Sequence, residues 1–136
     1  MSADDAENAA RLSEQLGYPA GVDAMRRRIE DILRLPDHAL FVACHGSEVI
    51  GWVHAMEVLH LQSERRVEIG GLVVEAAHRG AGTGAILVAR CEKWARDRGL
   101  LDVIVRSQIK REAAHRFYRR EGYAQTKTSV VFSKRL

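Results

Sequence analysis

The residues best placed to do chemistry are three glycines, Gly80, Gly82 and Gly84, which follow directly after Arg79. Three glycines in five residues let the backbone adopt positive φ angles and turn several amides in the same direction. An apolar run, Ile69–Val74, precedes this loop and an amphipathic run follows it, so the pattern predicts a strand, a glycine loop and a helix. Unpaired amides at the start of a helix attract anions. The loop therefore predicts a phosphate or pyrophosphate site, with a plain strand-to-helix turn as the alternative.

Two other phosphate-binding loops fit less well. A nucleoside-triphosphate loop ends in Gly-Lys-Ser/Thr, whereas Gly84 is followed by Ala-Ile. The dinucleotide pattern G-x-G-x-x-G/A is satisfied by Gly80, Gly82 and Ala85, and Asp102 lies near the expected acidic position. That acidic residue should end a strand, however, and Asp102 begins one. Dinucleotide binding stays open as a weaker alternative.

A second informative stretch lies on the last predicted helix. Ala114, Phe117 and Tyr118 follow helical spacing, and Gly122 ends the helix before Tyr123. Successive residues of a helix are turned by about 100°, so a Phe117 that points into the core places Tyr118 at the helix edge. The stretch predicts a core helix with an aromatic anchor and a phenol beside it.

The R-x-x-G-x-G sequence that starts at Arg79 resembles the coenzyme A motif of the GCN5-related N-acetyltransferases. The A-x-x-F-Y-x-x-x-G-Y sequence that starts at Ala114 fills every position of that family's second motif. The resemblance extends from about Leu16 to the C-terminus. It implies acetyl transfer from acetyl-coenzyme A to a primary amine, with small amines, aminoglycoside-like compounds and peptide amines all open as acceptors. The alternatives are a non-catalytic coenzyme A binding or sensing module and, more distantly, a nucleic-acid-binding domain.

The resemblance also implies roles for individual residues. Tyr118 would protonate the departing thiolate, and Glu68 occupies the position where some relatives keep a general base, although it could equally be an exposed strand carboxylate. An amide near Leu72 would stabilise the oxyanion. The residues expected to bind the cofactor come from the central strand, the glycine loop and the last helix: Leu72, Val73, Val74, Arg79, Gly80, Ala81, Gly82, Thr83, Gly84, Arg111 and Phe117.

The remaining elements are predicted from hydrophobic periodicity and turn residues. The expected fold class is α/β, in one domain over 1–136, with flanking helices and a mixed, mostly antiparallel sheet that includes a parallel strand pair. The family resemblance implies that this parallel pair is splayed. The expected elements are helices over 5–16, 22–35, 83–98 and 112–121, a hairpin of strands 39–44 and 49–57, a polar turn over 62–66, strands 69–74 and 102–106, and a final hairpin that includes 122–123 and 130–132.

Two features depart from the family pattern. Nothing before Asp5 is apolar enough for the family's first strand, so the sheet is expected to start one strand short. An open sheet edge is a template for pairing, and this favours a homodimer. Arg111 stands where many members have an asparagine that contacts coenzyme A, so that contact is not carried over.

Composition narrows the remaining possibilities. The 136 residues are 46% hydrophobic and 29% charged, with a net charge of +3, as in an ordinary globular domain rather than a nucleic-acid binder. The N-terminus is polar and acidic, and no apolar run reaches the roughly 20 residues of a membrane span. Cys44 and Cys91 lack CxxC partners and are expected to be buried free thiols. The histidines show no metal-ligand spacing, and a cytoplasmic location is expected.

Overall fold

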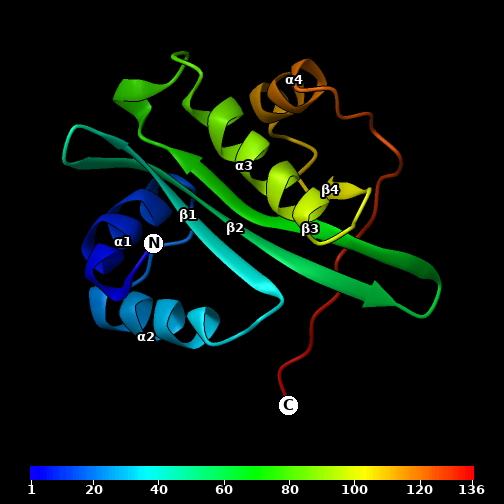
Figure 1. The fold of residues 1–136 in the computed structure, drawn as a ribbon, viewed down its shortest axis with the longest axis horizontal. Helices are drawn as coiled ribbons and strands as arrows, with labels where there is room; N and C mark the ends of the chain where they lie inside the picture. Colours follow the sequence, from blue (N-terminus) through cyan, green and yellow to red (C-terminus); the bar gives the residue numbers. More distant parts are fainter. The chain divides into compact units, whose positions relative to one another are not determined.

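A computed structural model describes the whole chain, residues 1–136. The chain forms two compact units, Met1–Val105 and Arg106–Leu136, which are described separately. Figure 1 shows the succession of elements along the chain. None of the helices combines the length and the apolar character that a membrane span requires.

The first unit contains three α-helices, two short 3-10 helices and four strands. In order they are η1 (Ala3–Asp5), α1 (Ala6–Gln15), α2 (Val22–Leu33), β1 (His38–His45), β2 (Glu48–His60), β3 (Ser63–Val74), η2 (Ala76–His78), α3 (Thr83–Asp97) and β4 (Val103–Val105). The second unit contains one helix, α4 (Glu112–Arg120). The helices and the four strands of the sheet lie where hydrophobic periodicity predicts them. No strand precedes the first helix.

The sheet has the order β1-β2-β3-β4 and is mixed, as expected. The first three strands form an antiparallel meander, in which β2 pairs with β1 on one side and with β3 on the other. Strand β4 pairs parallel to β3, and α3 makes the crossover between them. A parallel pair needs such a crossover, because the chain must return to the same end of the sheet.

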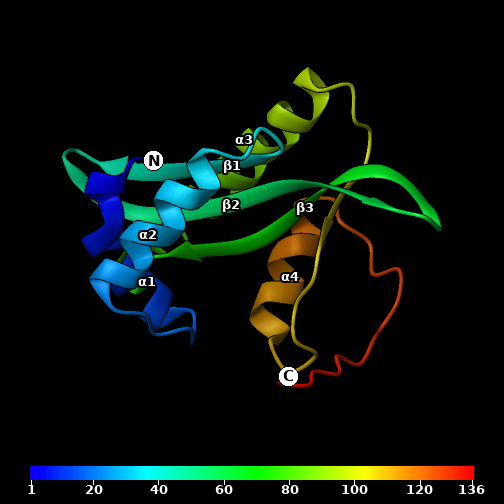
Figure 2. The same ribbon diagram turned by 90° about the horizontal axis from the view of Figure 1, so that it is seen from below.

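Side chains alternate between the two faces of β2, and each face packs on different helices. On one face, Trp52 donates its indole N–H to the carbonyl oxygen of Ala9 on α1, at 3.3 Å. On the other face, buried Val53 and Ala55 lie on the side of α3, whose Leu87 approaches Gly51. Figures 1 and 2 show α1 and α2 on one side of the sheet and α3 on the other.

Three expectations about local structure are wrong. Residues 63–66 belong to β3 rather than to a turn, because the hairpin turn takes up only residues 61 and 62. Neither part of the expected final hairpin forms a strand. β-Branched residues favour strands only where they have neighbours to pack on, and Val131 is 88% exposed. Cys44 is exposed, next to an irregularity in the pairing of β1 with β2. Cys91 is buried as expected, and burial raises the pKa of its thiol to about 12.

Candidate active site

The candidate site begins where β3 leaves β4. The two strands pair only through Val67, Glu68 and Ile69, although β3 continues to Val74. Across the other edge of β3, His54 pairs with Gly71 and Ala55 with Ile69, so Gly70 is the extra residue of a β-bulge. A bulge bends and twists its strand. Past Ile69 no strand pairs with β3 on the β4 side, and this confirms that the parallel pair is splayed.

Immediately after this strand, the chain forms a loop with open backbone. Gly80 and Gly82 have φ angles of 81° and 85°, which favour glycine, and a methyl group on either would meet no atom within 4 Å. Gly82 is the N-cap residue of α3 and has no side chain to cap it, and the first helical hydrogen bond runs from the N–H of Ile86 to the carbonyl of Gly82. The amides of the first helical turn are thus available to an anion. The loop therefore offers a place for a phosphate or pyrophosphate.

Arg79 ties the loop back to the strand. Its side chain is exposed, and its Nε donates to the carbonyl oxygen of Val74 at 3.1 Å. Arg79 directly precedes the first glycine of the loop, and the first turn of α3 carries no acidic residue. Backbone amides, the positive end of a 15-residue helix and Arg79 therefore all favour negative charge at the same place.

Helix α1 holds the start of the loop through residues that sequence reasoning missed. Arg11 forms an ion pair with Glu75, and Nη2 of Arg11 also donates to the carbonyl oxygen of Val49 at 3.3 Å. Gln15 donates to Glu75 at 3.0 Å and accepts from the N–H of Ala76 at 3.1 Å. The hydrogen bonds from Arg11 and then Gln15 hold the pKa of the Glu75 carboxyl below its usual range. The one signal in the sequence is that Arg11 and Gln15 are four residues apart and so share a face of the helix.

Glu68 lies within the paired part of β3, opposite Met56 on β2 and Ile104 on β4. Its neighbours Val67 and Ile69 are buried on the α3 face, so Glu68 lies on the face that carries α1 and α2. It is partly exposed. The carboxylate is thus on the opposite side of the sheet from α3, one residue before the last β3–β4 pair.

Glu57 is a second carboxylate of the sheet, and two arginines bind it. It lies on the α3 face of the sheet, and Arg65 and Arg98 bind its two oxygens at 2.7 Å. These two hydrogen bonds, from Arg65 first and then from Arg98, hold the pKa of Glu57 below its usual range. Its charge is already neutralised, so it does not favour a cationic acceptor.

In the second unit, the spacing of the second motif has a structural explanation. The N–H of Tyr123 donates to the carbonyl of Tyr118 at 2.9 Å, and that of Gly122 donates to the carbonyl of Arg119 at 3.1 Å. These bonds form a Schellman motif, which needs a left-handed residue, and Gly122 has a φ of 92°. The ring of Tyr118 packs edge-on against Phe117 and Tyr123, at 5.1 and 6.0 Å between centroids. The motif thus fixes the Tyr118 ring at the end of α4.

Arg111 is the N-cap residue of α4, and its exposed side chain does not cap the helix. An asparagine here would be among the strongest N-caps. The arginine makes no such capping hydrogen bond and places an exposed cationic side chain at the helix start. Arginine in place of asparagine at position 111 therefore affects the capping of α4 as well as the expected cofactor contact.

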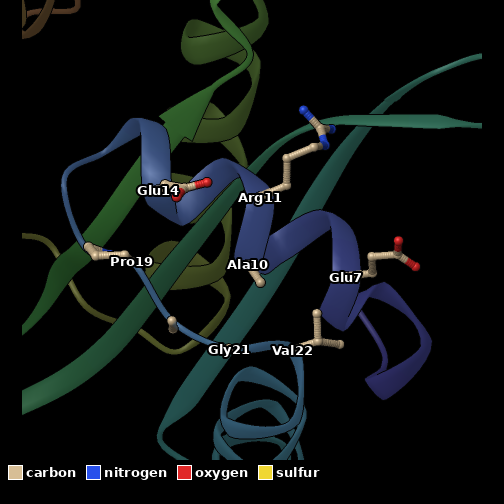
Figure 3. Close-up of a pocket in the computed structure, with 8 residues that line it drawn as sticks. Glu7, Ala10, Arg11, Glu14, Pro19, Gly21 and Val22 are labelled. Carbon is tan, nitrogen blue, oxygen red and sulfur yellow. The ribbon is translucent and has the colours of Figure 1, made fainter.

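A surface hollow lies elsewhere in the first unit. It measures about 510 Å³ and lies between α1 and the segment that leads into α2, as Figure 3 shows. It is lined by Glu7, Ala10, Arg11, Glu14, Pro19, Ala20, Gly21 and Val22. None of the residues predicted for the site lines it. The predicted site residues lie instead on the strand edge and in the glycine loop.

Comparisons with known proteins agree with this geometry. The family model described as the acetyltransferase (GNAT) family matches residues 6–123. The aminoalkylphosphonate N-acetyltransferase of Salmonella typhimurium is 34% identical over 116 residues, which cover 85% of this chain and 73% of that protein. The aminoglycoside N(6')-acetyltransferase type 1 of Stenotrophomonas maltophilia is 25% identical over 132 residues, or 93% of this chain and 86% of that protein.

A solved structure shares the fold at lower identity. It is AAC(6')-Iy in complex with the bisubstrate analogue CoA-S-monomethyl-acetylneamine, and it matches with a TM-score of 0.86 and 22% identity over 100% of this chain and 95% of its own. The family model spans most of the chain and includes both motifs. The chain belongs to the GNAT acetyltransferase family and is an N-acetyltransferase that uses acetyl-coenzyme A as its co-substrate.

Proposed function

We propose that this enzyme acetylates a primary amine on a small molecule. The observation that carries the proposal is the unpaired edge of β3 beyond Ile69, which leads directly to the uncapped start of α3. The relatives above are named for aminoalkylphosphonate and aminoglycoside acceptors, and both classes are small molecules with a primary amine. When bound, acetyl-coenzyme A supplies an acetyl group activated as a thioester, and the protein supplies alignment of the amine.

The cofactor would lie along the strand edge and the loop. Backbone groups of Leu72, Val73 and Val74 are placed to pair with an extended chain that contains amides, as a strand edge does. The amides of Gly80 to Gly84, together with Arg79, would hold the pyrophosphate. Phe117 is assigned to the cofactor by its place in the second motif, and Arg111 by its place at the position where many family members have an asparagine. The family model crosses from the first unit into the second, and this supports one acetyltransferase domain over 1–136.

Gly82→Asp tests the placement of the pyrophosphate. The side chain would enter open space at the helix start and put a negative charge beside the phosphates, at a cost of about 4 kcal/mol for two charges near a protein surface. We expect the affinity for acetyl-coenzyme A, measured by calorimetry, to fall at least ~100-fold, below detection, while the fold survives.

Two variants control this experiment. Gly82→Asn has the same shape as Asp and tolerates positive φ without the charge, so it should retain most of the binding. Gly21→Asp places the same charge at the N-cap of α2, where there is also open space, and should bind like wild type. Unchanged affinity in Gly82→Asp would rule out this location.

Tyr118 is proposed as the acid that donates to the departing thiolate. A phenol with an ordinary pKa near ~10 stays protonated at neutral pH. Tyr118→Phe keeps the ring between Phe117 and Tyr123 and removes only the hydroxyl. We expect turnover, followed by release of free thiol, to fall about 10- to 1,000-fold, with cofactor affinity and melting temperature near wild type. Tyr18→Phe, at a tyrosine that is 61% exposed, is the control. A Tyr118→Phe enzyme that turns over at the wild-type rate would remove Tyr118 from the chemistry.

Glu68 is proposed as the general base, acting directly or through water on the acceptor ammonium. Glu68→Gln keeps the size of the side chain and removes its basicity. The expected result is lower turnover with little change in cofactor affinity, with the largest deficit toward acidic pH, where less of the amine is already neutral. Glu64→Gln, an exposed carboxylate on the same strand, provides the comparison. A Glu68→Gln profile that matches wild type across the pH range would leave Glu68 as a surface carboxylate.

We further propose a homodimer in the cytoplasm. Strand β1 is at the open edge of the sheet, and Val130, Val131 and Phe132 are 76–90% exposed, so both regions offer surface for association. Two free thiols fit a reducing compartment. Sedimentation velocity at micromolar concentration should show a species of twice the mass of the chain, and a monomer alone would contradict the dimer.

A further inference from the structure

Two histidines are joined on the face of the sheet that lies opposite α3. His38 on β1 and His54 on β2 are diagonal neighbours, because His38 pairs with Met56 and His54 pairs with Leu40. Nδ1 of His38 lies 2.9 Å from Nε2 of His54, and the ring centroids are 5.1 Å apart. A hydrogen bond between two imidazole nitrogens requires one donor and one acceptor. The tautomers of the two rings are therefore coupled.

A nearby carboxylate favours one direction for this hydrogen bond. Oδ1 of Asp37 lies 3.9 Å from Nε2 of His38 and favours a proton on that nitrogen. Nδ1 of a neutral His38 then carries the lone pair and accepts from the Nε2–H of His54. Since a neutral imidazole has one proton, Nδ1 of His54 is left with a lone pair.

The remaining lone pair faces the point where β3 leaves β4. A methyl group built on Gly70 would lie 3.5 Å from Nδ1 of His54 and 2.5 Å from Cε of Met56. Gly70 is the bulged residue, directly after the last residue that pairs with β4. Glu68, the proposed base, is two residues earlier on β3 and opposite Met56, on the same face. The glycine leaves space in front of a basic nitrogen.

The surroundings keep His54 neutral. Burial, and then the charge of a protonated His38, lower the pKa of His54 to about 4. Asp37, directly before β1, and Glu68 on β3 bring carboxylates to this side, and Arg66, two residues before Glu68, brings a positive charge to the same face. Helix α2 presents the apolar Met25 and Ile29 to the sheet. His38 is more accessible, with its side chain 20% exposed beside an Asp37 side chain that is 52% exposed. A positive charge is therefore better accommodated on His38 than on His54.

We propose that His54 receives the proton that the acceptor ammonium must lose, and that His38 holds the resulting charge during acetyl transfer. The inference rests on the proposed function. An N–H bond of the ammonium breaks and an Nδ1–H bond forms on His54, directly or by way of Glu68. The Nε2–H of His54 passes to Nδ1 of His38, which becomes an imidazolium beside Asp37. After the product leaves, the shared hydrogen returns to His54 and water takes the proton from its Nδ1. His54 is the catalytic residue, and His38 and Asp37 are positioning residues.

Nitrogen-15 NMR of the histidine side chains in the wild-type protein tests which ring nitrogens carry protons, and it requires no catalytic turnover. At pH 7 His54 should carry its proton on Nε2 and show an unprotonated Nδ1, and it should stay neutral until the pH approaches ~4–5. Asp37→Asn should shift the tautomer balance of both rings, because it removes the charge that orients them. A His54 with its proton on Nδ1 would overturn the proposal, because the basic nitrogen would then not face the site.

Kinetics test the relay with 2-aminoethylphosphonate and neamine as acceptors. His54→Gln should lower turnover about 10²-fold or more at unchanged cofactor affinity. His38→Ala should be rescued by imidazole in the buffer, a response that a structural histidine would not give. His60→Gln, at an exposed histidine on the same strand, should match wild type.

The two kinds of failure are distinguishable. Wild-type turnover in His54→Gln, or no rescue of a folded His38→Ala, overturns the relay and leaves the acetyltransferase function intact. If the wild type binds acetyl-coenzyme A but releases no thiol with either amine, the proposed acceptor class fails. In that case the NMR tautomers still decide the arrangement of the histidines.

Discussion

The candidate site depends on one constraint, which is that the second half of β3 has a hydrogen-bonded strand partner on only one of its two sides. Each strand residue carries a donor and an acceptor, and a group left unpaired away from water costs free energy. Strand β3 satisfies its groups on the β2 side as far as Val74, but on the β4 side only as far as Ile69. The five residues from Gly70 to Val74 therefore present an open edge. An extended ligand that contains amides is the natural partner for such an edge, and the phosphate-attracting start of α3 comes directly after it.

The two faces of the sheet beside the bulge differ in their chemical groups. The extra residue at Gly70 marks the place where β3 leaves its parallel partner. On one face, α3 packs on the sheet and its N-terminus favours the phosphates. On the other face, Glu68 and the pair His38–His54 provide groups that can take a proton from an amine. Arg11 and Gln15 on α1 fix the start of the loop through Glu75 and Ala76.

Elements with strong periodicity were predictable from the sequence, and long-range pairings were not. The glycines at 80 and 82 predicted both the loop and its positive φ angles, and the Gly122 stop predicted the end of α4. The bulge at Gly70 was not predicted, because it is defined by the register with β2. The His38–His54 pair and the binding of Glu57 by Arg98 join residues 16 and 41 positions apart, so they require the fold. The predicted final hairpin does not form, because β propensity depends on burial and the side chains of residues 130–132 are exposed.

Amide hydrogen exchange with and without acetyl-coenzyme A tests the central claim most directly. The claim is that one ligand pairs with the open edge of β3 and with the start of α3. The account predicts slower exchange at backbone amides within Leu72–Val74 and within Gly80–Gly84 when acetyl-coenzyme A is added, with little change on the paired strands β1 and β2. Saturating acetyl-coenzyme A that leaves both segments exchanging at their free rates, or that protects only the hollow beside α1, would contradict it.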